Sequence, residues 1–447
     1  TVVLTYRLGR SLGGVAIGVL AALLVALSRF SIVWSQEVRM YGLATTLSTA
    51  SLWAAVELWK RGLPGLPGNV ATTSGRTRHV SGLRRTRAHA SWPWLPWTAY
   101  VALTSGALFT LYLTGTLMVV TNLGFLAIWW LRIRADGGSS QMRRRFVWPW
   151  ITAQVAVVAL LAPWIAYALP RMHSLSADQP FNARFFLQLY ATMLTVGSPL
   201  NLDRHLPWVL FIGGGLILGV VALINHLRYR GNTDRKATSR RALRWGQLVT
   251  LLSGLLLPPL AVVAVASPQL NLGFSRSVAP RYLLPLSTCY PLLLTWGITA
   301  LAERSHVWRS TRPGTTSKAE ENDLIRPIVA AIIASAAVLA AVSGLQSFYS
   351  GRARRDDYVT IAEILRGHRH PTDAVVLYVD RDWPIFAAHY AGPRHDLAYG
   401  ADLSDPQVVE HNLAPIWETA SAVWLVSTPE SLQADPSQGV IAWLADR

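Results

Sequence analysis

The sequence predicts a polytopic, all-α membrane protein with a small α/β domain at its C-terminal end. Of the 447 residues, 51% are hydrophobic and only 15% are charged, whereas about a quarter of an ordinary soluble domain is charged. Several apolar runs approach the roughly 20 residues with which a helix crosses the hydrocarbon layer. These two observations exclude a soluble enzyme, and a change of charge late in the chain separates the last 100 residues from the rest.

Nine apolar runs are the candidate membrane spans. They cover residues 12–33, 41–59, 95–112, 114–131, 147–168, 206–227, 246–267, 282–302 and 327–346. The third and fourth spans are separated only by the short segment Leu111–Gly115. Two spans are predicted there because the flanking loops are both rich in Arg and must lie on the same side of the membrane.

Basic residues alternate between the loops and thereby orient the spans. Seven, five, seven and five Lys or Arg residues occur in loops 60–94, 132–145, 228–244 and 303–326. One, three and two occur in the intervening loops 34–40, 169–205 and 268–281. Because short loops rich in Lys and Arg stay in the cytoplasm, the N-terminus is predicted to be cytoplasmic and the segment after about residue 348 to lie outside.

Two long loops have different compositions. Gly, Pro, Ser and Thr in 61–94 predict a mobile cytoplasmic linker. In the outer loop 169–205, apolar residues from Phe181 to Met193 recur at helical spacing. That spacing predicts a helix lying in the membrane interface.

The balance of charge reverses near residue 345. The preceding part has 33 Lys and Arg and 10 Asp and Glu, and the remainder has 8 and 14. The elements expected in this remainder are a helix through Ile361, Ile364 and Leu365, capped by Asp356–Asp357, and buried strands over 374–379 and 422–426. The chain is therefore divided into a membrane domain, 1–346, and a small extracytoplasmic α/β domain, 347–447.

The opening Thr1–Tyr6, followed by Arg7 and Arg10, has the composition of the end of an apolar span. A basic start with a signal peptide is not seen. The sequence therefore predicts that at least one further span precedes Thr1.

Composition and motifs exclude several function classes. The Arg residues lie in short loops between apolar runs, which is typical of cytoplasmic retention and not of nucleic-acid binding. The single cysteine, Cys289, lies within an apolar run, so neither an intrachain disulfide nor a Cys-based metal site is expected. The sequence contains no P-loop, no Gly-rich dinucleotide fingerprint and no Gly-x-Ser-x-Gly elbow.

The segment with the most functional information lies between the first two spans, on the predicted outer face. It reads Trp34-Ser35-Gln36-Glu37-Val38-Arg39-Met40-Tyr41. The arrangement Ser-Gln-Glu-x-Arg-Met-Tyr resembles the GT-C glycosyltransferases, in the branch of protein O-mannosyltransferases (family 39) and bacterial transferases that modify lipid A or other envelope glycans. Further features similar to this family are Tyr6–Arg10 before a Gly/Ala-rich span, the run Pro280–Pro285, and a terminal outer domain that begins near Arg355.

The resemblance implies an enzyme of the bacterial cytoplasmic membrane. It would transfer a sugar from a polyprenyl-phosphate donor to a glycan, lipid or protein acceptor on the outer face, with inversion and without a nucleotide. In this family a carboxylate in the first outer loop is the catalytic base. That loop is absent from this sequence, so the catalytic Asp or Glu is not identified.

Arg39, Arg276 and Arg281 are the candidate ligands of the donor phosphate. Loss of the sugar leaves a phosphate whose charge must be stabilised, and a guanidinium can hold phosphate oxygens through two parallel hydrogen bonds. The alternative is interfacial snorkelling and contact with lipid headgroups. Tyr41 and Tyr282 can donate to the phosphate, and the alternative for both is the aromatic belt of the membrane interface.

Glu37 is an auxiliary candidate beside Arg39. Its carboxylate can orient Arg39, bind a sugar hydroxyl or help a divalent cation to bridge the phosphate; the alternative is an exposed ion pair.

No resident metal site is predicted. The run Asp380-Arg381-Asp382 reads as a turn after a strand. A third ligand is missing for the histidines, which are His368, His370, His389 and His395.

Two other function classes remain open. A transporter or lipid flippase would carry functional charges inside its spans, but the predicted spans are almost free of acidic residues, and Arg29 and Glu57 lie near span ends where they can snorkel. A non-catalytic envelope assembly protein would bind partners through the acidic outer domain.

Overall fold

The computed structural model describes residues 1–37, 39–63, 94–136, 146–172, 183–197, 202–229, 235–266, 280–303, 317–350, 358–378, 383–397, 405–427 and 438–447. They form two compact units, Thr1–Ser347 and Phe348–Arg447.

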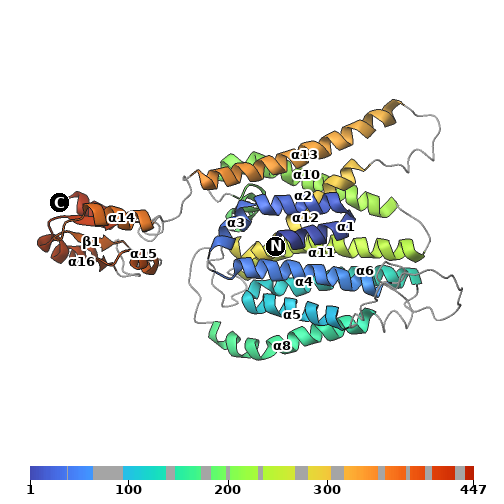
Figure 1. The fold of residues 1–447 in the computed structure, drawn as a ribbon, viewed down its shortest axis with the longest axis horizontal. Helices are drawn as coiled ribbons and strands as arrows, with labels where there is room; N and C mark the ends of the chain where they lie inside the picture. The colour runs from blue at the N-terminus through green and yellow to red at the C-terminus, as the bar shows by residue number, and fades with distance from the viewer. Residues whose placement is uncertain are drawn as a thin grey trace, which may run out of the picture. The chain divides into compact units, whose positions relative to one another are not determined.

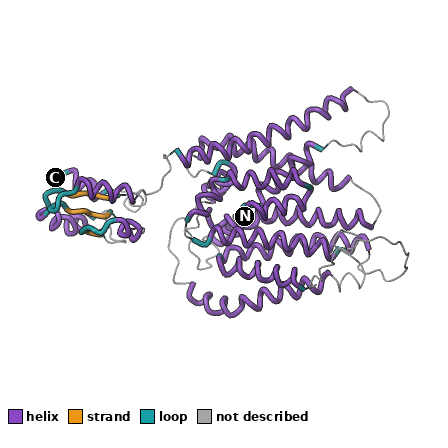
Figure 2. The backbone as a smooth tube through the Cα atoms, viewed as in Figure 1, coloured by secondary structure: helices purple, strands orange, loops and turns teal. Residues whose placement is uncertain are grey.

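The first unit is built from helices that run side by side (Figures 1 and 2). Its first half contains α1 (Val2–Gly13), α2 (Val15–Leu27), α3 (Arg29–Gln36), α4 (Tyr41–Gly62), α5 (Leu95–Thr110), the 3-10 helix η1 (Tyr112–Thr114) and α6 (Gly115–Asp136). Its second half contains α8 (Trp148–Met172), α9 (Ala183–Thr195), α10 (Leu202–Tyr229), α11 (Arg235–Ala266), the 3-10 helix η4 (Pro280–Leu286), α12 (Cys289–Ala302) and α13 (Ser317–Tyr349).

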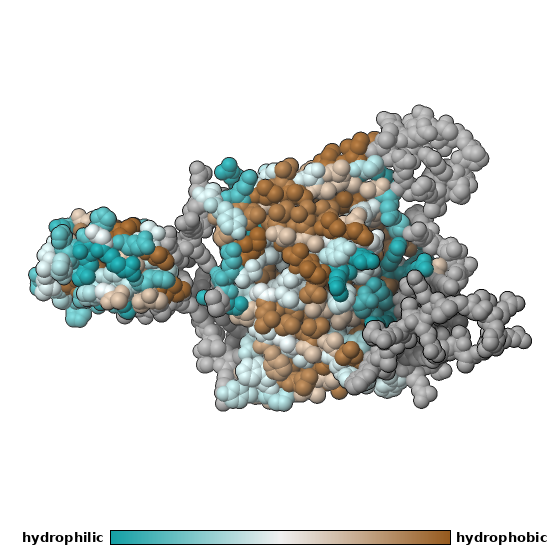
Figure 3. Space-filling model, in the orientation of Figure 1, coloured by the Kyte–Doolittle hydropathy of each residue, from teal (hydrophilic) through white to brown (hydrophobic). Residues whose placement is uncertain are grey.

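Several of these helices are long and apolar enough to cross a membrane, as expected of a multi-pass membrane protein. Six described segments meet both criteria: Tyr112–Ala135, Trp148–Ala168, Asp203–Arg228, Ala237–Ala264, Tyr282–Ala302 and Ile325–Tyr349. The bent pair α2 and α3 is a seventh if it is counted as one span. Apolar side chains accordingly form a broad band over the helices of this unit (Figure 3).

The predicted number of nine spans therefore stays a prediction. Helix α5 has only 16 residues, and α4, with 22, is rich in Ser and Thr. The predicted break near Leu111–Gly115 is confirmed, because α5 ends at Thr110, Leu111 is extended and α6 begins at Gly115. The predicted helix in the outer loop is present as α9.

The first predicted span, 12–33, is not one straight helix. Gly14, with φ of 120°, ends α1 and lets α2 fold back against it. A second break follows at Ser28, where α2 and α3 meet at 55°. The Ser28 backbone is extended, and its side chain accepts a hydrogen bond from the Ser31 N–H at 3.3 Å, which caps α3.

Hydrogen bonds between side chains join the helices α5, α6 and α8. The Gln154 amide donates to the Tyr100 hydroxyl at 2.9 Å, and the Asn122 amide donates to Gln154 Oε1 at 3.2 Å. The indole of Trp150 donates to Asn122 Oδ1 at 2.8 Å. Such bonds hold helices together where lipid gives no hydrophobic driving force between them.

The second unit is a small three-layer α/β fold. Its elements are α14 (Tyr358–His368), β1 (Ala374–Leu377), α15 (Trp383–His389), β2 (His395–Asp396), α16 (Pro406–Thr419), β3 (Val423–Val426) and α18 (Gly439–Ala445). The three strands are parallel in the order β2-β1-β3, with Val376 opposite His395 and Ala374 opposite Val423.

Both faces of the sheet are covered. Val375 and Leu377 pack with residues of α14 and α15. Val376 and Tyr378 pack with residues of α16 and α18 on the opposite face. The helix predicted through Ile361 and the two predicted strands are present as α14, β1 and β3, whereas β2, with two residues, was not predicted. The proposed cap Asp356–Asp357 lies outside the described residues.

Asp373 connects the turn before β1 to β3. We expect Asp373→Asn to lower the stability of the second unit. Its Oδ2 atom accepts hydrogen bonds from the Trp424 indole at 3.0 Å and from the His370 N–H at 2.9 Å. The Trp424 bond, followed by the His370 bond, holds the pKa of Asp373 below its ordinary value. Because the pKa is lower in the folded state, the stabilisation is present at neutral pH and is lost as the pH falls through the folded-state pKa.

Hydrogen exchange of the full chain measures this effect. At pH 7, Asp373→Asn should lower the protection factors of β1 and β3, and the difference from wild type should shrink in acid below pH of about 4. The control is Asp396→Asn, since Asp396 pairs with Arg394 at 3.5 Å and its side chain is 57% exposed. Equal protection of wild type and Asp373→Asn at pH 7 would contradict the assignment.

Candidate functional site

The motif between α3 and α4 lies where five elements of the first unit meet. The elements are α3, the first turns of α4, η1, α9 and η4. Apolar side chains of these elements, with Leu111 directly before η1, form one buried cluster, composed of Phe30, Trp34, Tyr41, Ala44, Leu111, Met193 and Leu284. The motif is therefore held by segments that are far apart in the sequence.

Three aromatic rings connect α3, α4 and η4. The rings of Trp34 and Tyr41 meet edge to face with centroids 5.6 Å apart, and those of Tyr41 and Tyr282 do so at 5.8 Å. Tyr41 is 1% exposed, whereas Tyr282 is half-buried. Both tyrosines that were predicted to contact phosphate thus lie together, and the ring of Tyr41 also anchors the start of α4.

Glu37 and Arg39 form an ion pair in the turn that leads into α4. Arg39 Nε lies 3.8 Å from Glu37 Oε2, and the two side chains are 49% and 27% exposed respectively. The Arg39 N–H also donates to the Glu37 carbonyl at 2.7 Å. Arg39, the more exposed partner, is open to a ligand from outside the bundle.

Of the other two predicted phosphate ligands, Arg281 and Arg276, the structure describes only the backbone of Arg281. Arg281 belongs to η4, directly before Tyr282, and its side chain is outside the described part of the structure. Arg276 lies outside the described residues. The structure thus brings together Glu37, Arg39, Tyr41, Tyr282 and the backbone of Arg281.

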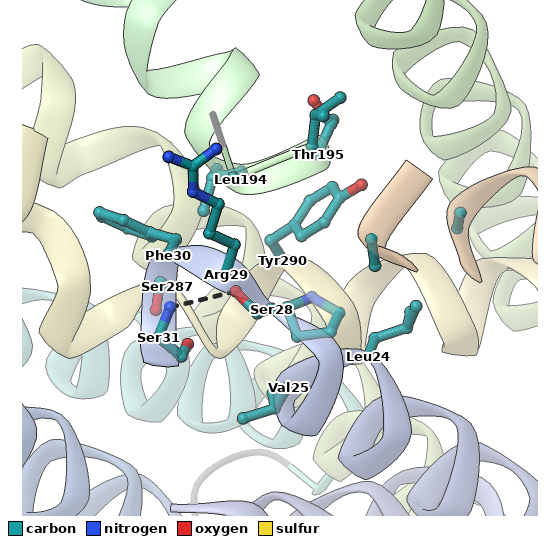
Figure 4. A pocket seen from close by; sticks show the side chains of 15 residues that line it. Leu24, Val25, Ser28, Arg29, Phe30, Ser31, Leu194, Thr195, Ser287 and Tyr290 are labelled. Atoms are coloured by element: carbon teal, nitrogen blue, oxygen red, sulfur yellow. Dashed lines mark hydrogen bonds between the residues drawn. The ribbon is translucent and has the colours of Figure 1, made fainter. Parts of the chain in front are cut away.

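A pocket beside this cluster was not predicted from the sequence. It lies at the bend between α2 and α3 and is partly enclosed, with a cavity of about 30 Å³. Arg29, Ser28, Ser31, Thr195 and Tyr290 line it with polar groups (Figure 4). Apolar walls come from helices that are candidate membrane spans or parts of one, with Leu24 and Val25 on α2, Pro291 on α12, and Ala337 and Ala341 on α13.

Arg29 is 5% exposed, so the snorkelling interpretation was wrong for this residue. The segment after α9 covers it. Gly197 has φ of 78°, and a Cβ atom at this position would lie 2.7 Å from Arg29 Cβ. On the other side, a Cβ atom on Gly344 of α13 would collide with the Val196 carbonyl. Two glycines therefore let the end of α9 fit between α3 and α13.

One charged side chain contributes to the described lining of the pocket. Among the described residues that line it, Arg29 is the only charged one. His205, in the first turn of α10, lies within electrostatic range of Arg29 and Arg204. The sequence signal for this site was a lone Arg in an apolar run, but its burial depends on α9, which is about 160 residues further along the chain.

The described residues contain no group of three or more His, Cys, Asp or Glu that could hold a metal ion. His368 and His370 line a shallow groove of the second unit beside Trp424. His389 ends α15 and His395 begins β2. The run Asp380–Asp382 lies outside the described residues.

In comparisons with known proteins, no family model matched the sequence and no curated protein was significantly similar to it.

Tyr41→Ala tests the packing of this end of the first unit. Removal of a buried aromatic ring costs about 3–5 kcal/mol, and Tyr41 contacts rings on both sides. We expect a loss of this size in the free energy of unfolding, measured with denaturant in detergent micelles. Leu43→Ala is the control, because Leu43 lies on the same helix but is 59% exposed; equal losses in the two variants would contradict the assignment.

Proposed function

We propose that the chain belongs to a membrane glycosyltransferase of the GT-C type. It transfers a sugar from a polyprenyl-phosphate donor to a glycan, lipid or protein acceptor on the outer face of the bacterial cytoplasmic membrane. The observation that carries the proposal is the Glu37–Arg39 pair at the start of α4, within the Ser-Gln-Glu-x-Arg-Met-Tyr motif. The aromatic contact to η4 and the multi-pass helical architecture support it.

The reaction breaks the bond between the anomeric carbon and a phosphate oxygen, which leaves with the electron pair. The acceptor oxygen forms the new bond to that carbon and loses its proton to a carboxylate base, which is not assigned in this chain. Arg39 stabilises the departing phosphate through charge-assisted hydrogen bonds. Glu37 orients Arg39 or binds a sugar hydroxyl, and Tyr282 donates to the phosphate. The Glu37 carboxylate can also help a divalent cation to bridge the phosphate.

A transporter or lipid flippase and a non-catalytic assembly protein are the two alternatives to this function. A transporter or flippase would carry charges near the middle of its spans. Arg132, which is 2% exposed, lies only three residues from the end of the span Tyr112–Ala135, so its position does not favour transport. A non-catalytic assembly protein would depend on the second unit and would not need the Glu37–Arg39 pair.

Arg39→Gln should lower sugar transfer at least tenfold. A hydrogen bond to a charged group contributes about 1.5–3 kcal/mol, and about 1.4 kcal/mol corresponds to a factor of ten. The measurement is consumption of labelled polyprenyl-phosphate sugars in membranes that contain the protein. Arg184→Gln is the matched control, since Arg184 is an exposed Arg of α9. If wild type consumes no donor in the presence of acceptor, the proposal fails.

The proposed orientation can be tested by cysteine labelling, because Cys289, the single cysteine, is fully buried. In intact cells, an impermeant maleimide should label Glu418→Cys in the second unit. It should label Arg61→Cys, at the end of α4, only after the membrane is opened. Wild type is the background control, and labelling of Arg61→Cys in intact cells would reverse the proposed topology.

A further inference from the structure

We propose that four exposed arginines at one end of α6, α10 and α11 bind the headgroups of anionic phospholipids. They are Arg134, Arg228, Arg240 and Arg241, and they are called the arginine surface below. The surface lies at the far end of α6 from the candidate site, because η1, which belongs to that site, directly precedes α6. The 22 residues of α6 separate the two by about 33 Å. The inference does not depend on the proposed function.

The packing of α6 against α11 places Arg134 and Arg240 at the same level. The two helices lie side by side (Figure 1). A Cβ atom added to a glycine of either helix would touch the other helix at three levels, which pair Val120 with Gly254, Gly124 with Thr250, and Ile128 with Gly246. The helices are therefore antiparallel, and each step of four residues along one matches a step of four along the other. The same register sets position 134 opposite position 240.

Arg228 and Arg241 extend the surface onto α10. The Arg241 Nη2 group donates to the Arg228 carbonyl at 3.4 Å, so the first turns of α11 lie against the end of α10. The candidate membrane spans of these three helices have their limits at Ala135, Arg228 and Ala237. All four arginines thus lie within about one helical turn of the limit of a span, which is the depth at which lipid headgroups begin.

Trp130 indicates the depth of the headgroups along α6. Its side chain is 56% exposed, and Arg134 Cζ lies 4.5 Å from the centre of its ring. Trp is enriched at the boundary between lipid and water, and a guanidinium is attracted to the face of the indole. The Arg134 charge is therefore held at the level of the lipid phosphates.

The charge of the surface is not neutralised by the acidic groups around it. Within the described residues, none of the four arginines forms an ion pair. Acidic side chains near the ends of α4 and α12 have partners of their own, since Glu57 lies 2.8 Å from Lys60 and Glu303 lies 3.5 Å from His226. The side chain of Asp136, which ends α6, is outside the described part of the structure. Each Lys or Arg near an anionic membrane surface favours binding by about a factor of five.

Apolar side chains on the same helix faces favour a lipid over a soluble anion. Val221, seven residues before Arg228, is 49% exposed, and Leu123, eleven residues before Arg134, is 36% exposed. At 3.6 residues per turn, each of these apolar residues shares a face with its arginine. The acyl chains of a phospholipid can lie along these faces while its phosphate contacts the guanidinium groups, whereas a soluble phosphate gains nothing from the apolar side chains.

The lipid preference of the purified full chain in detergent tests the proposal. The probes are phosphatidylglycerol and phosphatidylcholine with identical acyl chains at equal concentration, and bound lipids are counted by native mass spectrometry. Wild type should bind phosphatidylglycerol at least tenfold better, and the preference should fall as the salt concentration rises. Removal of two charges in Arg134→Gln/Arg241→Gln should lower the preference at least fivefold. The matched control is Arg184→Gln/Arg204→Gln, which removes two exposed arginines from α9 and the start of α10 and should change the preference less than twofold.

Several outcomes would overturn the proposal. It fails if wild type binds both lipids equally, if the two Gln double variants lose the same preference, or if glycerol 3-phosphate displaces phosphatidylglycerol as well as the free lipid does. Arg134→Lys/Arg241→Lys keeps both charges and should keep the preference; a loss as large as that of the Gln variant would assign the effect to packing and contradict the proposal. If the Gln double variant does not fold, Arg240→Gln and Arg241→Gln decide singly, since an unchanged preference in both contradicts the surface.

Discussion

The break between α2 and α3 is the feature on which the arrangement of the candidate site depends. In hydrocarbon every backbone polar group needs a partner within the protein, so a helix can be interrupted only where other protein segments surround the break. Ser28 meets part of this need with its side-chain cap on α3, and the end of α9 covers the adjacent Arg29. The 55° bend then directs α3 across the end of the bundle, which brings Trp34 against Tyr41 and places the Glu37–Arg39 turn before α4.

Close contacts between glycines allow the other helices to pack around this break. Lipid chains are as apolar as leucine, so helices associate through close packing and polar contacts and not through the hydrophobic effect. Gly9 of α1 faces Gly18 of α2, and Gly219 of α10 faces Gly297 of α12, each so closely that an added Cβ atom would lie about 3 Å or less from backbone atoms. The hydrogen bonds among Tyr100, Asn122 and Gln154 serve the same purpose on the other side of the unit.

The sequence predicted those features that depend on neighbouring residues. Long apolar runs indicated the helices, and short continuous apolar runs indicated β1 and β3, because both patterns depend on residues that are neighbours in the sequence. The Glu37–Arg39 pair was also predictable, since its members are two residues apart. The bend at Ser28 was not, because a Ser-Arg pair in an apolar run has the same composition whether it snorkels or is buried. The Arg29 pocket takes residues from α2, α3, α9, α12 and α13, so only the tertiary fold reveals it.

The two arginines of this region differ in a way that suits different tasks. The Arg39–Glu37 pair is partly exposed at 3.8 Å, and such pairs contribute little to stability. Arg39 can therefore exchange its partner for a ligand at small cost in free energy. A group that stabilises charge as it develops in a reaction needs this freedom. Arg29 is enclosed by Gly197, Phe30 and the wall of α2, and its position is fixed by packing. Packing thus restricts Arg29 to one position, whereas Arg39 stays accessible from outside the bundle.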